Sequence, residues 1–519
     1  MKFWLIFLCS VSGHDTAKIL ATVFTPSYSH QITFRPLWIE LSKRGHQVTL
    51  LTTDPMKDPT LSNIREIDLS GSYGIMEKYG ASEALTNQTD KLKAIKTYLG
   101  ALSKTADWQL GHPDVQKIVR NPDEKFDLII TEIVYPTHMG FVDRFKVPFI
   151  GVASFNQERS HRRLGNMVHP IIFPDGSLPM LPPLTFMERL LSVFHTVFMW
   201  WYSDFVLYPE QTAVARKHLG EDIRNLEEIE ADMSFLFESL NPAITKVRPI
   251  GPNTIVISGM HLKEPKPLPK ELEQYMDNAK EGVIYFSLGT NVKAYLLNDN
   301  IKRALLETFA ELPYKVLWKY EGSAIENLPK NVKIMKWIPQ QDLLGHPNVK
   351  LFMTQCGLQS LEEAVVNHVP MVAIPFMPEQ KRNAKILNEK GIGLSLDNRN
   401  MTKAALKMTI LEVINNPKFK KNTIELANLS KDVEKPGVEK AVWWTEYCLR
   451  NKGAKHLKSP AADIPLYQLL LLDVLATVIA VLLVIVIIAF LIIKICVRIL
   501  RYLLRFICGK DTKIKRKTH

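Results

Sequence analysis

Residues 351–364, LFMTQCGLQSLEEA, combine a short apolar strand with the start of a helix, joined through Thr354, Gln355, Cys356 and Gly357. Free backbone N–H groups at the start of a helix attract anions without the help of a basic side chain. The turn is therefore a candidate site for a negatively charged ligand, although the glutamine and the cysteine that would face this ligand carry no charge.

A second turn of the same kind ends the apolar run GVIYFSLGT, at Ser287, Gly289 and Thr290. Taken alone, this segment is more simply an ordinary strand-to-loop turn. Two anion-binding turns together could hold a diphosphate.

Two pairs of side chains could bind the rest of such a ligand. Trp337 and Gln340 lie three residues apart; an indole can stack on a nucleobase and an amide can hydrogen-bond its edge, although a single tryptophan is more often a core residue. Glu379 and Gln380 follow an apolar strand. A carboxylate beside an amide suits sugar hydroxyl groups, and the alternative is an acid placed at a helix N-terminus by the helix dipole.

The first half of the chain alternates apolar strands with helical segments, which indicates a parallel sheet with ligands at the carboxyl ends of its strands. A helix is expected from about residue 32 to residue 44, before Gly45. Segment 184–208 is very apolar and aromatic, and core or the wall of an acceptor pocket is favoured over a membrane-surface helix. The expected strands are 18–24, 46–52, 126–132 and 147–154.

A proline-rich connector at 259–275 separates this half from a second series of strands and helices. Two such α/β halves suggest a cleft between them. The strands expected in the second half are 282–290, 314–320, 331–339, 349–355, 369–376 and 391–396.

Both ends of the chain carry membrane-related patterns. Residues 1–13 have a lysine, an apolar run and small residues at their end, which predicts a secretory signal peptide. Residues 474–493 form a charge-free apolar run, and twenty helical residues span about 30 Å, the thickness of the hydrocarbon core. We predict a single transmembrane helix there.

The basic charge of the chain is concentrated in the tail. Residues 494–519 hold nine Lys or Arg and one acid, Asp511, so they contribute +8 of the net charge of +12. This distribution predicts a type I anchor with a cytosolic tail and argues against nucleic acid as a partner. Arg516 and Lys517 resemble a dibasic retrieval signal of the endoplasmic reticulum.

The cysteines indicate no disulfide framework, because Cys356 and Cys448 alone lie between the signal and the anchor. The lumenal part must then be stable through its core. Three sequons are candidates for glycosylation, at Asn87, Asn400 and Asn428.

The segments WIPQQDLLGHP and TQCGLQSLEEAVVNHVPMVAIPFMPEQKRNA, in this order, are similar to the signature of family 1 UDP-glycosyltransferases. HLKEPKPLPKELE, RNKGAKHLK and the closing anchor resemble the animal membrane-bound branch, which includes UDP-glucuronosyltransferases and insect or viral ecdysteroid-type UDP-glucosyltransferases. The resemblance implies a GT-B fold, in which two Rossmann-like, doubly wound domains face a cleft. The expected parts are a signal peptide at 1–13, an acceptor-binding domain at 14–245, a UDP-sugar-binding domain at 246–458, a juxtamembrane segment at 459–473, the transmembrane helix at 474–493 and the tail at 494–519.

The resemblance also implies a role for individual residues. Trp337 would stack on uracil, Gln340 would hydrogen-bond it, and Glu363 would bind the ribose. The transferred sugar would contact Glu379 and Gln380. The diphosphate would be held by Ser287, Gly289, Thr290, Gln355, Gly357, Gln359 and Ser360. In the first domain, SHQITFRPL matches the loop with the catalytic histidine, His30, and FDLIITE ends in its acidic partner, Glu132.

These roles are chemically consistent. A neutral imidazole can accept the proton of an alcohol that attacks the anomeric carbon, and a carboxylate behind it fixes the tautomer and stabilises the imidazolium. A single displacement inverts the anomeric carbon. The sequence has no Asp-x-Asp, the metal–diphosphate clamp of other glycosyltransferases, so we expect neither a metal nor another cofactor besides the UDP-sugar co-substrate.

Several positions depart from the family pattern. Glu132 stands where the family commonly has Asp, Gln355-Cys356-Gly357 where it has His-Gly-Gly, and Glu379 where many members have Asp. Ser360 and Glu363 also fit a helix capping box, which would make Glu363 structural.

We therefore expect an inverting UDP-glycosyltransferase of the endoplasmic reticulum membrane, with lumenal catalytic domains, that transfers a sugar to a hydroxyl of small lipophilic acceptors. The loop at 354–364 resembles the insect-type branch and favours UDP-glucose as the donor. The alternatives are a transferase that uses UDP-glucuronate, one that glycosylates a lipid, and a non-catalytic lipophile-binding membrane protein of the same fold. The identity of the acceptor and the oligomeric state, including a homo-oligomer, stay open.

Overall fold

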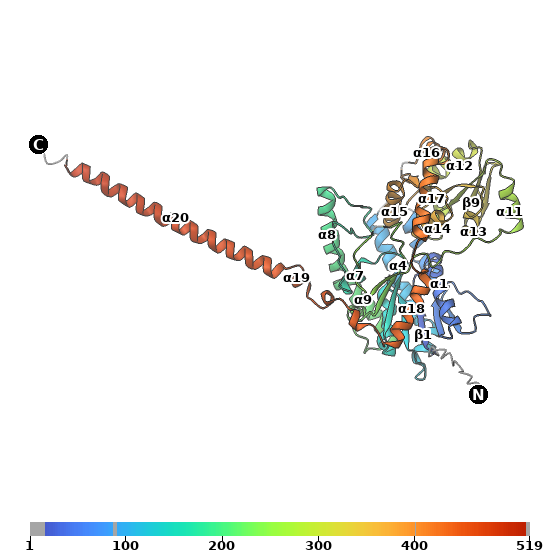
Figure 1. Cartoon of the computed structure of the whole chain (residues 1–519), viewed down its shortest axis with the longest axis horizontal. Helices are drawn as coiled ribbons and strands as arrows, with labels where there is room; N and C mark the ends of the chain where they lie inside the picture. The colour runs from blue at the N-terminus through green and yellow to red at the C-terminus, as the bar shows by residue number, and fades with distance from the viewer. Residues whose placement is uncertain (1–15, 87–90, 246, 400, 515–519) are drawn as a thin grey trace, which may run out of the picture. The chain divides into compact units, whose positions relative to one another are not determined.

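A computed structural model describes residues 16–86, 91–245, 247–399 and 401–514 of the chain (Figure 1). The chain divides after Ser459 into a large unit, which holds both predicted α/β halves, and a small C-terminal unit. The predicted signal peptide at 1–13, the sequons at Asn87 and Asn400, and the dibasic pair Arg516 and Lys517 lie outside the described residues.

The first sheet has seven parallel strands in the order β3-β2-β1-β4-β5-β6-β7. Its central strands are buried along almost their whole length, which requires helices on both faces. The order of the strands reverses between β1 and β4, and a ligand crevice is expected at the carboxyl ends of these two strands. The strands are β1 (Lys18–Thr22), β2 (Gln47–Thr52), β3 (Ile64–Asp68), β4 (Leu128–Glu132), β5 (Phe149–Ala153), β6 (Phe235–Glu238) and β7 (Thr254–Val256).

The second sheet has six parallel strands in the order β10-β9-β8-β11-β12-β13, so its reversal lies between β8 and β11. The two sheets confirm the predicted α/β class with two parallel, doubly wound halves. The strands are β8 (Val283–Ser287), β9 (Lys315–Lys319), β10 (Val332–Met335), β11 (Val349–Thr354), β12 (Met371–Ala373) and β13 (Gly393–Ser395).

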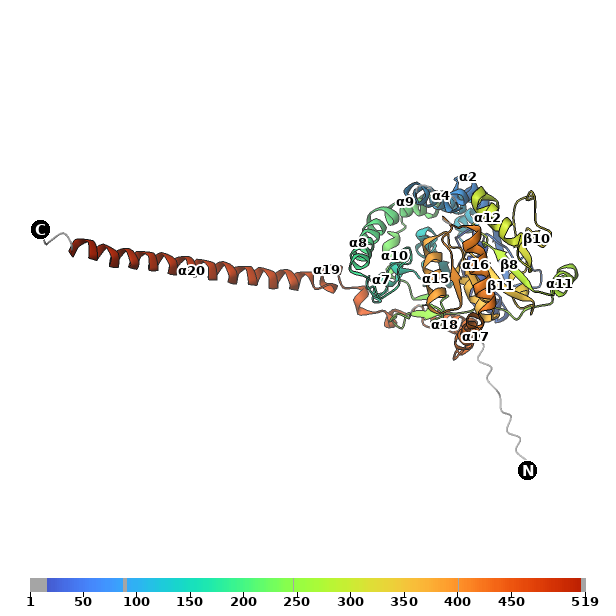
Figure 2. The same cartoon turned by 90° about the horizontal axis from the view of Figure 1, so that it is seen from above.

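Helices connect the strands and cover the sheets (Figure 2). Those of the first half are α1 (Tyr28–Lys43), α2 (Ser72–Lys78), α3 (Ala81–Thr86), α4 (Lys91–Gly111), α5 (Pro113–Arg120), α6 (Gly140–Phe145), α7 (Glu158–Arg163), α8 (Phe186–Tyr202), α9 (Tyr208–Leu219) and α10 (Leu226–Ala231). Those of the second half are α11 (Lys270–Asp277), α12 (Asp299–Ala310), α13 (Gln340–Leu344), α14 (Leu358–Val366), α15 (Pro378–Glu389), α16 (Lys403–Asn415), α17 (Pro417–Lys431) and α18 (Gly437–Arg450). Short turns of helix are η1 (Pro136–Met139), η2 (Ser203–Leu207), η3 (Ala294–Leu296), η4 (Lys455–Leu457) and η5 (Pro460–Ala462).

Two segments that follow residue 245 in the sequence belong to the first half, so the structure differs from the predicted boundary between residues 245 and 246. Strand β7 follows that boundary but pairs with β6 in the first sheet. Helix α18 also returns to the first half, where Ala441 and Val442 are buried in its core and Arg44 Nη1 lies 3.2 Å from Glu446 Oε1. The first half therefore takes residues from both sides of the second.

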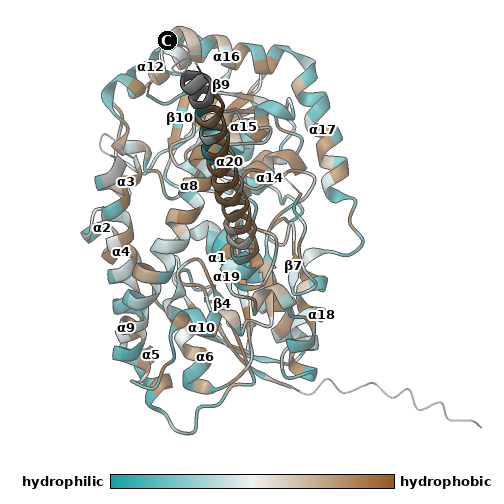
Figure 3. Cartoon of the chain, turned by 90° about the vertical axis from the view of Figure 1, so that its left-hand side faces the viewer, coloured by the Kyte–Doolittle hydropathy of each residue, from teal (hydrophilic) through white to brown (hydrophobic). Residues whose placement is uncertain are grey.

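The small unit contains α19 (Leu466–Leu469) and the long helix α20 (Leu472–Ile514). Residues 472–507 of α20 are long and apolar enough to cross a membrane, and none of that stretch is buried. The charge-free run predicted at 474–493 lies inside it, and its apolar character appears as the brown helix in Figure 3. Residues 186–219 of the large unit pass the same test of length and composition.

Candidate active site

The carboxyl ends of the two sheets meet inside the large unit. Gln359, near the start of α14, donates a hydrogen bond from Nε2 to the carbonyl oxygen of Ser154, which directly follows β5, over 3.2 Å. The ring of Trp337, after β10, meets the ring of Tyr28 edge to face, with 4.9 Å between their centroids. The predicted site residues therefore come from loops that contact one another across the two halves.

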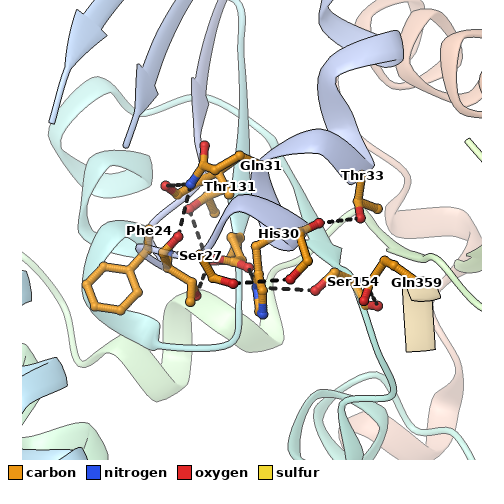
Figure 4. Close-up of polar contacts among 12 residues, drawn as sticks. Phe24, Ser27, His30, Gln31, Thr33, Thr131, Ser154 and Gln359 are labelled. Carbon is orange, nitrogen blue, oxygen red and sulfur yellow. Dashed lines mark hydrogen bonds and ion pairs between the residues drawn. The ribbon is translucent and has the colours of Figure 1, made fainter. Parts of the chain in front are cut away.

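His30 and Glu132 form a direct pair, and Figure 4 shows His30 with its contact to Ser154. His30 lies in the first turn of α1, and its Nδ1 is 2.5 Å from Oε1 of Glu132, the buried last residue of β4. The other carboxylate oxygen, Oε2, accepts hydrogen bonds from Thr25 N at 2.8 Å and Thr25 Oγ1 at 2.7 Å. Burial alone would raise the pKa of Glu132, but His30 and Thr25 outweigh it and hold this pKa below its usual value.

The surroundings of this pair fix its geometry. Ser154 Oγ lies 3.2 Å from His30 Nδ1, so two oxygens face the same ring nitrogen. Gln31 donates from Nε2 to the carbonyl oxygens of Val23 and Thr25 at 3.0 Å each, which holds the loop before α1. No hydrogen bond joins His30 Nε2 to any part of the chain that the structure describes, so this nitrogen can take a proton.

Gln340, Ser360 and Glu363 come together on the second half. Gln340 donates from Nε2 to Ser360 Oγ at 3.0 Å and to Glu363 Oε2 at 2.6 Å, and its Oε1 accepts from Tyr285 Oη at 3.0 Å. Trp337 is 51% exposed, so its ring is not the core residue that the alternative interpretation suggested.

The capping-box interpretation of Ser360 and Glu363 is wrong. Helix α14 begins at Leu358 after Gly357, so Ser360 lies inside its first turn and not at the N-cap. Glu363 is buried, and desolvation raises its pKa to about 7, against the opposing effect of the Gln340 hydrogen bond. Its carboxyl group faces Gln340, where it could contact a bound ligand.

A buried cluster behind Glu363 was not predicted. His261 Nδ1 lies 3.8 Å from Glu362 Oε2, and His261 Nε2 lies 4.0 Å from Glu363 Oε1. Desolvation, together with the charge of Glu363, raises the pKa of Glu362 to about 8, and desolvation lowers the pKa of His261 to about 4. At neutral pH the Glu362 carboxyl group and the His261 imidazole are therefore mostly neutral, and the Glu363 carboxyl group is partly protonated.

The loop after β8 approaches the loop after β11 closely. Gly289 has φ +72, and a Cβ atom at this position would lie 2.3 Å from Gln355 Nε2. Its N–H donates to Ser287 Oγ at 3.2 Å. Glycine adopts this left-handed backbone without strain, and any other side chain would have to displace the Gln355 amide. The two predicted diphosphate turns thus lie side by side.

Two lysines support the loop after β8, and the sequence interpretation missed both. Lys319 Nζ donates to the Gly289 carbonyl at 2.8 Å and lies 2.6 Å from Glu321 Oε1. Lys293 Nζ donates to the Thr290 carbonyl at 2.9 Å. A charged residue at the end of the apolar run YKVLWKY was the available signal.

The turn at 354–357 contains a strained residue. Cys356 is fully buried and has φ +67, a left-handed conformation that favours glycine. Its carbonyl oxygen accepts from Asn383 Nδ2 at 3.0 Å. The left-handed backbone explains in physical terms why glycine suits this position in the family pattern.

Gln380 and Glu379 differ in what they can offer a ligand. Gln380 accepts at Oε1 from the N–H groups of Phe376 and Met377, and its Nε2 donates to Gln355 Oε1 at 2.9 Å. Its amide is therefore engaged in bracing the two turns. Glu379 is half-buried, and desolvation raises its pKa to about 7, against the opposing charge of nearby His30.

Among the described residues, one group of side chains could hold a metal ion, and it is made of Glu273, Asp277 and His346. None of the three is a predicted site residue. Asn428, the one sequon within the described ranges, is exposed on α17.

Comparisons with known proteins show the family and the fold of the chain. The family described as "UDP-glucoronosyl and UDP-glucosyl transferase" matches residues 17–510. The chain is 33% identical over 474 residues to UDP-glucosyltransferase 2 of Dactylopius coccus, covering 91% of each protein. It is 28% identical to UDP-glucuronosyltransferase 2B15 of Homo sapiens, covering 92% of this chain and 93% of that one. Among solved structures, the spinosyn forosaminyltransferase SpnP shares the fold with a TM-score of 0.56 at 15% identity, over 84% of this chain and all of that one.

Proposed function

The chain belongs to the UDP-glucoronosyl and UDP-glucosyl transferase family and is a UDP-glycosyltransferase, and we propose that it transfers glucose from UDP-glucose to a hydroxyl of a small lipophilic acceptor. The mechanism rests on one observation, the contact between His30 and Glu132. This pair lies at the carboxyl ends of the strands of the first sheet, where the loops of the second half approach.

In this mechanism His30 is the general base. Glu132 accepts the Nδ1–H of His30, which leaves Nε2 unprotonated and able to take the proton of the acceptor hydroxyl. The acceptor oxygen forms a bond to the anomeric carbon as the bond from that carbon to the UDP oxygen breaks. The electron pair leaves with UDP, and the anomeric carbon inverts. Glu132 stabilises the imidazolium that forms.

The leaving UDP is held by the second half. Trp337 stacks on the uracil, Gln340 hydrogen-bonds it, and Glu363 binds the ribose. The turns at 287–290 and 355–360 bind the diphosphate through backbone N–H groups, including those at the start of α14. We propose that no metal ion is needed, since these groups can balance the charge of the leaving group.

Glucose as the donor is supported by the chemistry of the sugar side. The side chain assigned to the sugar, Glu379, is a carboxyl group whose pKa is raised to about 7 by desolvation. At neutral pH the group is partly ionised, and its ionised form would repel the carboxylate of UDP-glucuronate, whereas the hydroxyl groups of glucose can hydrogen-bond with either form. The insect relative with 33% identity is also named a glucosyltransferase.

The test uses the full chain in detergent or vesicles with labelled UDP-glucose or labelled UDP-glucuronate and a panel of phenols, with and without EDTA. We expect transfer from UDP-glucose that EDTA leaves unchanged. Exclusive use of UDP-glucuronate would refute the donor, loss of turnover in EDTA would refute metal independence, and ligand binding without any turnover would favour the non-catalytic alternative.

We further propose a type I topology in the endoplasmic reticulum membrane, with α20 as the anchor and the large unit in the lumen. Asn428 supplies the test because it is exposed. In a lumenal large unit it can receive an N-glycan, so endoglycosidase H should increase the mobility of the wild-type chain on a gel, and this shift should shrink in Asn428→Gln. A chain that carries no glycan and is digested by protease added to intact microsomes would contradict the orientation.

A further inference from the structure

Helix α8 exposes apolar side chains, which is the opposite of what a surface helix of a soluble protein does. From Phe186 to Leu207, every side chain that is mostly exposed is apolar. The most exposed of them are Phe186, Met187, Phe194, Val197 and Phe205, at 55–70%. Soluble surface helices place their polar residues outward, and a continuous apolar face of this kind marks a site of contact with another apolar phase.

The hydroxyl side chains of this segment point the other way. Ser192 and Thr196 of α8 and Ser203 of η2 are buried, and Ser192 Oγ donates to the carbonyl oxygen of Pro170. They follow one another at four and seven residues, which is the spacing of one helical face. The hydroxyl groups therefore face the protein, and the aromatic and aliphatic side chains face outward. Figures 1 and 2 both draw α8 at the edge of the large unit.

This segment is fastened to the large unit, so it does not cross a membrane by itself. It continues through η2 into α9, where Tyr208, Ala215 and Leu219 are buried in the core of the first half. Asp204 in η2 also forms ion pairs with Arg162 and Arg163 of α7, each at 2.5 Å. An apolar phase could cover the outer face of α8 but could not take in the whole helix.

The place where the chain leaves the large unit indicates what covers the apolar face of α8. Ser459, the last residue of the large unit, donates from Oγ to the Gly165 carbonyl at 3.2 Å. Gly165 begins the loop that Ser192 contacts at Pro170, five residues later. This loop adds two exposed apolar side chains, Met167 at 55% and Ile172 at 50%. The chain thus leaves the large unit beside the apolar face.

The distance to the anchor is short. Residues 460–471 separate Ser459 from α20, and twelve extended residues reach at most about 40 Å. If α20 crosses a bilayer, as the proposed topology requires, the large unit cannot move farther than this from the membrane surface. A lipid surface is then always within reach of α8, which gives it an advantage over a soluble partner that must be captured by diffusion.

We propose that α8, with the loop at 167–172, lies flat in the interfacial region of the bilayer as a second membrane contact of the catalytic unit. Its apolar face enters the boundary between headgroups and acyl chains, as is typical of interfacial helices. Trp201 and the phenylalanines suit this depth, since aromatic side chains are enriched at membrane interfaces. The inference rests on the proposed membrane anchoring and not on the identity of the sugar donor.

The experiment places one bimane label at a time on the full chain in phosphatidylcholine vesicles, with Cys496 and Cys508 replaced by serine. Phe194→Cys reports on α8, and Val484→Cys reports on the anchor. Met408→Cys on α16 is the matched control, because this side chain is apolar and 71% exposed but lies outside the proposed contact. Quenching by acyl-chain nitroxide lipids is compared with quenching by iodide.

We expect nitroxide lipids to quench the label at 194 at least three-fold more than the label at 408, with the reverse order for iodide. A label at 194 that iodide reaches as easily as 408, while 484 is quenched by lipid, would overturn the inference and leave the anchor intact. Protection at 194 from both quenchers would indicate a second copy of the chain instead. Iodide access at 484 would refute the anchoring and the inference together. Glucosyl transfer, measured on the same vesicles, tests the proposed function separately.

Discussion

His30 Nδ1 and Glu132 Oε1 lie 2.5 Å apart and join the first turn of α1 to the last residue of β4. The second carboxylate oxygen is held by the N–H and the hydroxyl of Thr25, so the carboxyl group cannot rotate without losing two hydrogen bonds. The position of the imidazole is therefore set by the sheet, and its tautomer is set by a carboxylate whose pKa stays below the usual value.

Replacing His30 with alanine should remove the proposed general base. We expect kcat to fall by roughly 10²–10⁴-fold, the range for loss of general-base catalysis, with the affinity for UDP nearly unchanged. Initial rates with a phenol acceptor and UDP binding by calorimetry measure the two effects. His456→Ala on the exposed turn η4 is the control and should keep wild-type rates. A His30→Ala enzyme within a few-fold of wild type would rule out this mechanism.

Glu132→Gln should act through the tautomer of His30. Because Thr25 donates two hydrogen bonds to one oxygen of residue 132, the amide oxygen of Gln must face Thr25 and its NH₂ must face Nδ1. Nδ1 then accepts, Nε2 carries the proton, and the base is in the wrong form. We expect kcat to fall about 10³-fold with an unchanged KM for the donor.

Glu132→Asp is the matched variant for this prediction. It keeps the charge but is one methylene shorter, so it should lose only about ten-fold in kcat if the carboxylate is what orients the imidazole. Equal losses in Glu132→Gln and Glu132→Asp would mean that the position of the side chain matters and the tautomer does not.

Gln340→Ala should weaken donor binding. The Gln340 amide donates to Ser360 and Glu363, and its loss removes the hydrogen bond that we propose it makes to the nucleotide, together with one of the donors that lower the pKa of Glu363. We expect KM for the UDP-sugar to rise about ten-fold with kcat within about three-fold, which corresponds to one lost hydrogen bond. Gln274→Ala is the control, because this glutamine is exposed on α11. An equal rise in KM for Gln274→Ala would contradict the assignment.

The fold follows largely from local patterns, because each parallel strand is a short apolar run ended by a turn. The family resemblance, and not these patterns, assigned Gln340, Ser360 and Glu363 to one nucleotide site, and the structure brings their side chains together. The return of α18 to the first half could not be predicted, because its apolar face does not say which of two apolar surfaces it covers.

Other features depend on contacts between distant segments. The cluster of His261 with Glu362 joins residues a hundred positions apart, and nothing near His261 in the sequence marks its partner. Segment 184–208 was expected to be core or pocket wall because it is very apolar and rich in aromatic residues. The spacing of Ser192, Thr196 and Ser203 was the available signal that its inward face is the polar one.

Glu362→Gln should change how stability depends on pH. Burial and the charge of Glu363 raise the pKa of Glu362 from 4.5 to about 8, so the folded state keeps a proton that the unfolded state releases. The contribution of this group is therefore fully present below about pH 4.5 and is lost as pH rises to about 8. We expect the variant to match the wild type at pH 4 and to be more stable at pH 8, by up to about 4 kcal/mol, in thermal or urea unfolding of the full chain. The lowered pKa of His261 acts in the opposite sense below about pH 6.5, and at pH 8 this imidazole is neutral in the folded and the unfolded states, so the comparison at pH 8 does not include its titration. Glu425→Gln, at an exposed glutamate on α17, should leave the profile unchanged, and a Glu362→Gln profile parallel to the wild type would mean that Glu362 is ionised in the folded protein.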